Sequence, residues 1–311
     1  MSILAVFAAL VPVFLLIISG VAVKRWLVPD DTHWIGAERI VYYVLFPALL
    51  INTLAHADLT RVPVEQVAGT LLLAVVIMTL LCLALRPLMV AWFRISGPAF
   101  TSVFQGATRW QTYVGLAVAG NLFGDYGLAL ASVAAVAMIP LLNIINTWVL
   151  AHYAAPEKPH WSAVLLAVAK NPFIWSCLVG ILLNVLHVPI PAVIGTFADA
   201  LGRAALALGL LLVGAGLQIR GLLRPQPATL TAAALKLIVM PAISIALAKL
   251  FGVSGEPLAV IACCAAVPAA SNAYVLARQM GGDTLLLAEI LAVETVLAAI
   301  TMPIAIELAV R

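Results

Sequence analysis

A polar run at residues 105–117 interrupts one of the most apolar stretches of the chain, and it carries Arg109 and Gln111 between Gly106 and Gly115. An arginine at the centre of a bilayer costs at least about 2.5–3.5 kcal/mol by insertion scales. The glycines are expected to break the helix and to expose backbone groups that lipid cannot satisfy. The run therefore predicts a wet cavity or a bound ligand. The planar guanidinium of Arg109 would suit a carboxylate, because it can donate two parallel hydrogen bonds.

A second stretch, residues 266–278, has the same character. Pro268 breaks the helix there, and Ser271 and Asn272 supply polar side chains. Two such interrupted segments in corresponding parts of a sequence indicate the substrate site of a secondary transporter. We expect Gln111 and Asn272 to lie near each other across that site, where the N-termini of half-helices can attract anionic groups.

Three more residues complete the predicted substrate site: Tyr113, Asn171 and Asn52. Tyr113 belongs to the first interrupted stretch. Asn171 precedes a proline at the start of an apolar stretch, so a helix-capping role is its alternative. Asn52 could equally serve as a hydrogen-bonding residue between packed helices.

Glu294 lies deep in the last apolar stretch and is the candidate charge partner of Arg109. One hypothesis is that the pair is purely structural. The other is that substrate competes with Glu294 for Arg109, so that protonation of Glu294 would release the arginine and couple transport to protons. Lys236 we interpret as a side chain that snorkels to the membrane surface.

Catalytic and metal-binding patterns are missing from the sequence. It has no H-E-x-x-H, G-x-S-x-G, Walker or dinucleotide-binding motif, and no cysteine spacing typical of a metal site or a disulfide framework. We expect no catalysis, no metal and no organic cofactor. Transport would then be driven by a gradient of substrate or of a coupling ion, either a proton or sodium.

The composition predicts an all-α membrane protein that crosses the bilayer many times. Of 311 residues, 65% are hydrophobic and 9% are charged, whereas soluble domains carry roughly 25% charged residues. The net charge of +3 comes from residues in short loops, which excludes a nucleic-acid partner and leaves membrane lipids. About ten stretches are long enough to span a bilayer, near residues 4–23, 38–56, 66–92, 98–122, 127–150, 164–186, 197–219, 228–251, 257–278 and 284–308.

The two halves of the chain resemble each other. Residues 1–153 form the first predicted repeat, residues 154–163 a cytoplasmic linker, and residues 164–311 the second repeat. Because each repeat has an odd number of spans, the second is inserted upside down. The matching positions, in order, are Pro12 with Pro172, Gly20 with Gly180, Pro29 with Pro189, Gly124 with Gly282 and Pro140 with Pro303.

Lysine and arginine residues gather on one side of this topology. The positive-inside rule places that side in the cytoplasm, and hence both termini outside it, for a multi-pass protein of the cytoplasmic (inner) membrane. The residues on the cationic side are Lys24, Arg25, Arg86, Arg94, Lys158, Lys170, Arg220, Arg224 and Arg278.

Several runs resemble the auxin efflux carrier family, most closely its bacterial malonate- or dicarboxylate-carrier branch. The resemblance covers nearly the whole chain and is most specific over residues 268–283. It is carried by the runs at residues 43–50 (YVLFPALL), 171–174 (NPFI), 267–279 (VPAASNAYVLARQ) and 282–283 (GD).

The resemblance implies ten spans in a 5+5 inverted repeat, with broken spans four and nine that cross, as in sodium–proton antiporters and bile-acid symporters. It implies a scaffold of spans one, two, six and seven, a transport domain of spans three to five and eight to ten, elevator motion and a homodimer. Plant members have a Pro-Asn pair at the first crossing. Here Gln111 takes the place of that asparagine, with Trp110 as the alternative, and Asn171 matches a family asparagine associated with substrate.

Together these observations predict a secondary transporter of a small organic anion, a mono- or dicarboxylate, that works by an elevator-type alternating-access mechanism. The alternative in the same class is a sodium- or proton-coupled symporter of a larger amphipathic acid. In another class, an anion channel would need a continuous polar pore, which the sequence does not reveal.

Overall fold

The computed structural model describes residues 3–58, 63–154, 161–218, 222 and 225–310. These residues are almost all helical, and no strand occurs among them. Two five-residue π-helical turns, η1 (Val41–Leu45) and η3 (Leu235–Val239), continue directly into the helices on either side. The α-helices are α1 (Ile3–Trp26), α2 (Asp31–Ile40), α3 (Phe46–His56), α4 (Val64–Phe93), α5 (Gly97–Thr108), α6 (Thr112–Tyr153), α7 (Trp161–Ala169), α8 (Pro172–Val185), α9 (Ala192–Ala215), α10 (Pro227–Ala234), α11 (Met240–Leu250), α12 (Gly255–Ala266), α13 (Asn272–Met280) and α14 (Thr284–Val310).

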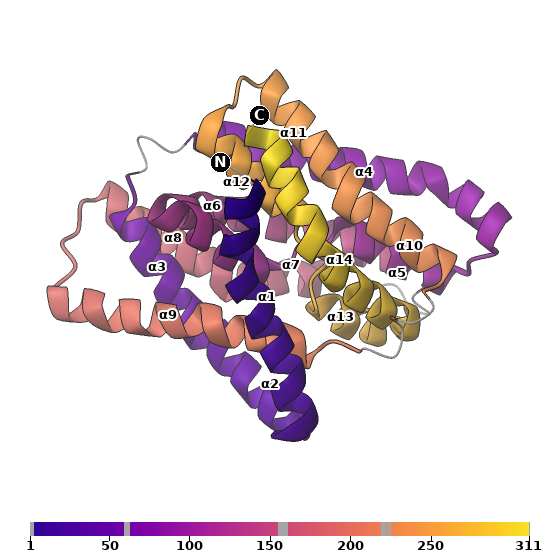
Figure 1. The fold of residues 1–311 in the computed structure, drawn as a ribbon, viewed down its shortest axis with the longest axis horizontal. Helices are drawn as coiled ribbons and strands as arrows, with labels where there is room; N and C mark the ends of the chain where they lie inside the picture. The colour runs from indigo at the N-terminus through magenta and orange to yellow at the C-terminus, as the bar shows by residue number, and fades with distance from the viewer. Residues whose placement is uncertain (1–2, 59–62, 155–160, 219–221, 223–224, 311) are drawn as a thin grey trace.

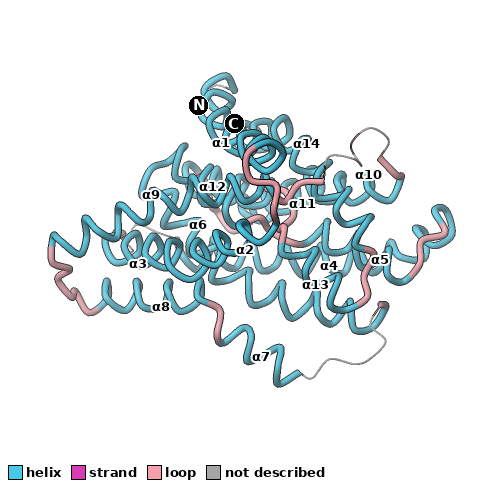
Figure 2. Tube along the Cα trace, turned by 90° about the horizontal axis from the view of Figure 1, so that it is seen from below, coloured by secondary structure: helices cyan, strands magenta, loops and turns pink. Residues whose placement is uncertain are grey.

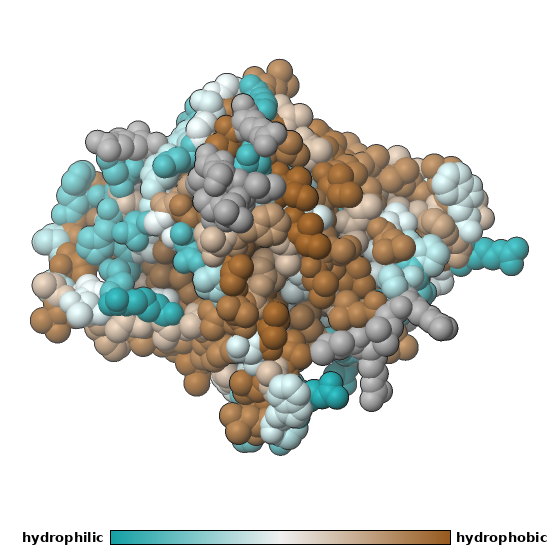
Figure 3. Space-filling model, viewed as in Figure 1, coloured by the Kyte–Doolittle hydropathy of each residue, from teal (hydrophilic) through white to brown (hydrophobic). Residues whose placement is uncertain are grey.

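Within the described ranges, seven continuous helical stretches are long and apolar enough to cross a membrane, and α8 and α12 are shorter apolar helices. Large apolar side chains also face outward, among them Val193, Leu250 and Leu285, each more than three-quarters exposed. Figure 3 shows a broad brown band of apolar residues across the visible face, with teal residues gathered toward its edges. A soluble surface would not carry so much contiguous apolar area. The chain is therefore a multi-pass membrane protein.

The helices pack in two groups (Figure 1). The first contains α1, α3, α8 and α9, in which α3 packs on α8 and α9, and α1 on α9. The second contains α4, α5, α10, α11, α12 and α14, with α6 in contact with both groups. In both views the start of α1 lies beside the end of α14 (Figures 1 and 2). The predicted linker at 154–163 lies mostly outside the described residues.

Glycines allow α1 and α9 to approach to backbone contact. A Cβ atom added at Gly214 would lie 1.8 Å from the carbonyl oxygen of Ile17, and one at Gly20 would lie 2.1 Å from that of Leu211. Small residues at such crossings let helices approach closely in membranes, where van der Waals packing is a main source of helix association. This contact fixes the axes of the first group.

Two stretches differ from the continuous helices that hydropathy alone suggests. Within α6 the backbone at Gly124 adopts φ 58° and ψ −148°, so the helix turns there into a second helical segment, at the predicted boundary between spans. The predicted span 164–186 is instead divided into α7 and α8. Asn171 causes this division, because its side chain caps α8 by accepting a 2.9 Å hydrogen bond from the Phe173 amide, with Pro172 in the first turn.

Candidate substrate site at two interrupted helices

The first interruption lies between α5 and α6 and consists of Arg109, Trp110 and Gln111. Arg109 is extended, with φ −68° and ψ 155°, and so is Gln111, with φ −80° and ψ 93°. Gly106 and Gly115, predicted to supply the break, lie inside the helices on either side of it. That part of the prediction is wrong.

The two glycines make room for neighbouring side chains. A Cβ atom at Gly115 would lie 2.8 Å from the Trp110 ring, and one at Gly106 would lie 2.6 Å from Ile290 and 3.2 Å from a carboxylate oxygen of Glu294. Both glycines are helical, and neither has a positive φ. They therefore position the residues around the break without forming it.

The second interruption lies between α12 and α13, at residues 267–271. It contains Pro268, as predicted, and Val267 before it is extended, with φ −65° and ψ 150°. A residue that precedes proline is driven out of the α region, and proline has no N–H for the helical ladder. The helix resumes at Asn272, with Ser271 as its N-cap residue.

Hydrogen bonds join the two interruptions directly. The Gln111 amide donates to the Pro268 carbonyl oxygen at 3.0 Å, and the Gln111 side chain donates to the Ser271 hydroxyl at 3.0 Å. Arg109 Nη1 donates to Asn272 Oδ1 at 2.8 Å. The segments thus lie side by side as the sequence predicts, although Gln111 pairs with Ser271 and the partner of Asn272 is Arg109.

The helices that leave the crossing both begin there without a side-chain cap. Neither Gln111 nor Ser271 makes a capping hydrogen bond to the helix that follows it. The first N–H groups of a helix have no partner within the helix, and they carry the positive end of the helix dipole. The starts of α6 and α13 therefore both add positive potential at the crossing, which favours an anion.

Arg109 is buried, with 5% of its surface exposed, and it has no anionic partner among the described residues. Its Nε atom has no hydrogen-bond partner. The predicted pair with Glu294 is wrong. Glu294 instead accepts a 2.9 Å hydrogen bond from the Ala269 amide, and the charge that acts on it is that of Lys236. Glu294 lies against Gly106 on α5, whereas the Arg109 side chain turns to α13.

A cavity of about 130 Å³ lies at the crossing. Six predicted site residues line it: Arg109, Gln111, Tyr113, Asn171, Ser271 and Asn272. Asn171 therefore lines the cavity in addition to capping α8. Asn52 does not belong with them, since it lines a separate cavity of about 660 Å³ between α3, α6 and α9. No group of three or more His, Cys, Asp or Glu side chains in the described ranges comes together as metal ligands do.

The rings of Tyr42, Tyr113 and Phe173 line the small cavity, and Phe46 packs behind them without lining it. Phe46 and Tyr113 stack with their centroids 4.7 Å apart and an interplanar angle of 10°. The centroid of the Phe173 ring lies 5.3 Å from that of Phe46 and 5.5 Å from that of Tyr42. Gly209 on α9 leaves space for this stack, because a Cβ atom there would lie 3.2 Å from Phe46 and 3.3 Å from Tyr113. Tyr113 and Phe173 thus offer flat apolar contact beside the polar groups of the crossing.

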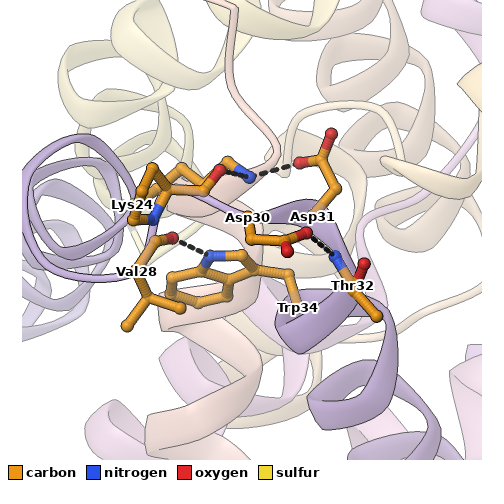
Figure 4. Close-up of polar contacts among 7 residues, drawn as sticks. Lys24, Val28, Asp30, Asp31, Thr32 and Trp34 are labelled. Atoms are coloured by element: carbon orange, nitrogen blue, oxygen red, sulfur yellow. Dashed lines mark hydrogen bonds and ion pairs between the residues drawn. The ribbon is translucent and has the colours of Figure 1, made fainter.

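A third cavity, of about 510 Å³, adjoins the crossing and shares Glu38, Tyr113, Ser271 and Asn272 with the small one. Lys24 and Trp34 line it at the turn between α1 and α2 (Figure 4).

Hydrogen bonds brace that turn (Figure 4). Lys24 pairs with Asp31 and donates to the Pro29 carbonyl oxygen, and the Trp34 indole donates to the Val28 carbonyl oxygen at 2.7 Å. The Thr32 amide donates to Asp30, which lowers the pKa of that carboxyl because the hydrogen bond favours its ionised form. An ion pair and several hydrogen bonds thus hold the turn that lines this side of the third cavity.

The sequence reasoning missed several residues of the site. Glu38, Tyr42, Thr112 and Asn143 line the small cavity. Asn143 had a usable signal, since it is a polar residue inside an apolar span. Glu38 had none, because it lies at a predicted span end where charges are common.

Lys236 was interpreted wrongly. It is fully buried and does not snorkel. It lies in the π-helical turn η3, whose geometry hydropathy does not reveal.

Comparisons with known proteins agree with this architecture. The sequence model of a family described as membrane transport protein matches residues 5–306. A relative described as an uncharacterized transporter, from Methanothermobacter thermautotrophicus, is 23% identical over 299 residues, which cover 94% of each chain. With its apolar helices and its crossing of two interrupted segments, the chain belongs to the membrane transport protein family, that of the auxin efflux carriers.

Proposed function

We propose that this transporter carries a small organic anion, a mono- or dicarboxylate, bound in the cavity at the crossing. Arg109 is the observation that carries the proposal. It is a buried cation that lines a cavity. Among the described residues its side chain donates a hydrogen bond to the neutral amide of Asn272, and its Nε atom has no partner. A buried charge without a counter-charge is costly. A carboxylate substrate would supply that counter-charge.

Neighbouring groups support the same ligand. The Trp110 indole N–H is buried without a partner, and Trp110 also lines the cavity. The uncapped starts of α6 and α13 favour negative charge at the same place. The rings of Tyr113 and Phe173, which line the cavity, would contact the carbon skeleton of the substrate.

The cavity volume favours one of the two transporter hypotheses. About 130 Å³ suits a small carboxylate. A larger amphipathic acid, cotransported with a proton or sodium, would have to extend into the adjoining cavity of about 510 Å³, which shares residues with the small one. The small anion is the proposal, and the larger acid is the alternative that the uptake experiment below also tests.

Alternating access is proposed as the mechanism. The cavity of about 660 Å³ shares no lining residue with the two at the crossing, which disfavours the continuous pore that an anion channel needs. The first helix group would be the scaffold, spans one, two, six and seven, and a dimer would form through it. The second group with α6 would be the transport domain, spans three to five and eight to ten, which moves as an elevator. The division is supported by the packing of α3 on α8 and α9 and of α1 on α9 within the first group, although α1 also contacts α14 of the second.

The ten-span inverted repeat and its orientation are also proposals. The breaks before α6 and before α13 are equivalent positions in the two predicted repeats. The start of α1 lies beside the end of α14 (Figures 1 and 2), which supports an even number of crossings because both ends would then lie on the same side of the membrane. Lys24 and Arg278 line the same cavity of about 510 Å³, which would open to the cytoplasm. Both termini would then lie outside the cytoplasm, in the inner membrane.

Uptake of radiolabelled carboxylates into proteoliposomes tests the proposal. Small mono- and dicarboxylates and one bulky amphipathic acid would be compared with wild-type protein, Arg109→Gln and the control Arg25→Gln, whose side chain is exposed in the last turn of α1. We expect saturable uptake of a small carboxylate that Arg109→Gln abolishes and Arg25→Gln retains. Uptake of the bulky acid alone would favour the alternative, and uptake that does not saturate would favour a channel.

A further inference from the structure

Three charged side chains are buried in the described part of the chain: Arg109, Lys236 and Glu294. Together they carry a net charge of +1 when all are ionised. Arg109 belongs to the proposed substrate site. Lys236 and Glu294 lie behind that site, where neither lines any of the cavities described above.

Lys236 and Glu294 are both fully buried and both incompletely satisfied. The Lys236 Nζ atom has no hydrogen-bond partner, and neither has Glu294 Oε1. The two side chains act on each other electrostatically, yet no direct ion pair joins them. The π-helical turn η3 carries Lys236, and such turns occur frequently at functional sites. A pair retained only for stability would be expected to use these atoms in hydrogen bonds.

The surroundings of the pair are otherwise nearly free of charge. Gly106 on α5 and Ala232 on α10 lie beside Glu294, and α5 and α10 contain no charged residue. The Cys264 thiol on α12 faces Lys236. The Cys263 thiol lies beside Cys264 within α12. The remaining titratable groups on α14 or on the helices packed against it lie toward the ends of those helices or at the crossing: Lys24, Arg25, Lys249, Glu256, Tyr274, Arg278, Glu289 and Glu307.

Glu294 is also tied to the crossing. Its Oε2 atom accepts a hydrogen bond from the Ala269 amide, inside the second interruption. Ala270, the next residue, lines the substrate cavity. A hydrogen bond to an ionised carboxylate is stronger than one to a neutral acid. The charge on Glu294 is therefore sensed by the segment that would hold the substrate.

We propose that Glu294 and Lys236 form a proton-accepting pair. By taking up a proton or not, the pair adjusts the net charge of the buried core, which consists of Arg109, Lys236 and Glu294, to the charge of the substrate. A monocarboxylate neutralises the net charge of +1 without any proton. A dicarboxylate would leave the core at −1, and a proton taken from water onto the Glu294 carboxylate returns it to zero. The proton leaves to water on the other side together with the substrate. A loaded core without net charge is the form that crosses an apolar environment most readily. The inference rests on the transport function proposed above.

Proton movement during uptake tests this stoichiometry. Proteoliposomes that contain a pH-sensitive dye would be supplied with malonate or with glycolate, in alkaline buffer where the malonate monoanion is scarce. We expect one proton to enter with each malonate and none with glycolate. Glu294→Gln raises the net charge of the core to +2, so malonate should enter without a proton and glycolate uptake should fall. Glu289→Gln is the matched control, because this carboxylate on the same helix hydrogen-bonds Gln226 and Thr229 away from the pair.

Infrared spectroscopy of the purified protein tests the pair without transport. Lowering the pH should add a carboxylic-acid C=O band that Glu294→Gln lacks and Glu289→Gln keeps. In Lys236→Met the band should persist to more alkaline pH, because the carboxylate loses its counter-charge. Should the single variants fail to fold, the double variant Lys236→Met/Glu294→Gln restores a net charge of +1, and it should take up glycolate but not proton-coupled malonate.

Two results would overturn the proposal in distinguishable ways. Malonate uptake by the wild type without proton entry, or an infrared band unchanged by Glu294→Gln, would reject the pair as the proton acceptor and leave the transport function standing. Failure of the wild type to take up any carboxylate would reject the substrate class, and this stoichiometry with it.

Discussion

At the scale of single residues, the crossing brings together groups that would each be unfavourable elsewhere in a membrane. Arg109 and the indole N–H of Trp110 are buried donors that lack a full set of partners. They sit beside helix starts that carry no cap. Each of these features alone has structural explanations. Their convergence on one cavity of about 130 Å³ is what favours an anion.

Replacement of Arg109 should therefore change binding more than folding. Loss of one bidentate charge-assisted contact costs roughly 1.5–3 kcal/mol, about ten- to a hundredfold in affinity. Arg109→Lys should rescue little, because an ammonium cannot reproduce the planar fork. Calorimetric titration of purified protein with the transported carboxylate measures the change, with size-exclusion chromatography to check that the variants fold. Wild-type affinity in Arg109→Gln would show that the arginine is structural.

Gly115→Ala tests how closely the Trp110 ring packs against α6. The added methyl group would lie 2.8 Å from the indole ring, and such overpacking costs about 1–3 kcal/mol. We expect a lower melting temperature in detergent and a displaced ring, visible as altered tryptophan fluorescence. Gly120→Ala on the same helix is the control, because its methyl group would make ordinary contact with Leu128 at 3.7 Å. Equal melting temperatures for the two variants would contradict the close packing.

At the scale of helices, hydropathy predicts well where the chain crosses the membrane and poorly how each crossing is built. The predicted span 66–92 corresponds to α4, and the proline-containing break at 267–271 lies where Pro268 predicts it. The first break lies in the predicted segment, but at residues 109–111 and not at the predicted glycines. Gly106 and Gly115 attract attention because glycine is helix-breaking in general, whereas here they are needed for contacts with α14 and Trp110, which only the folded chain defines.

Long-range pairing explains the other differences between prediction and structure. Arg109 and Glu294 are opposite charges in apolar spans, and a sequence offers no way to see that α13 takes the arginine while Lys236 faces the glutamate. Asn52 is similar in type to Asn171, yet α3 directs it to the far cavity. Residue type identified the polar groups of the membrane interior, and tertiary packing decided how they pair.

The close backbone contact between α1 and α9 gives a testable prediction at the scale of helices. Gly214→Ala places a methyl group 1.8 Å from the Ile17 carbonyl oxygen, so the two helix backbones must separate. We expect loss of folded protein in detergent, measured as the monodisperse fraction in chromatography. Gly195→Ala on the same helix has nothing within 4 Å of the new methyl group and should be tolerated. A monodisperse, stable Gly214→Ala protein would disprove the backbone contact.

At the scale of the whole molecule, the cavities define two faces. One cavity contains Asp125 and His56, and the others reach the crossing from the side of Lys24 and Gln218. Tyr113 lines both cavities at the crossing, and no lining residue is common to both faces. This separation is what the proposed mechanism, with access to the substrate from one face at a time, would require.

Thiol labelling of two positions tests the assignment of faces. The native cysteines are all buried, so background labelling should be low. A membrane-impermeant maleimide should label Gln218→Cys in inverted vesicles and Asp125→Cys in intact spheroplasts, and neither in the opposite preparation. Labelling with the reverse sidedness would overturn the proposed orientation, and labelling of both positions from one side would contradict the two-faced arrangement.

The uncapped helix starts at the crossing also have a consequence for the protein at rest. Two helix N-termini and Arg109 favour an anion in the cavity, although the Glu38 carboxylate also lines it, and chloride and other inorganic anions are always present in a cell to occupy it. Inorganic anions would then act as competitive occupants of the carrier. We expect the apparent Michaelis constant for the organic substrate to rise with chloride more than with an equal ionic strength of a bulky, poorly fitting anion. The ionic composition on each side of the membrane would in that way set how readily each face of the carrier accepts its cargo.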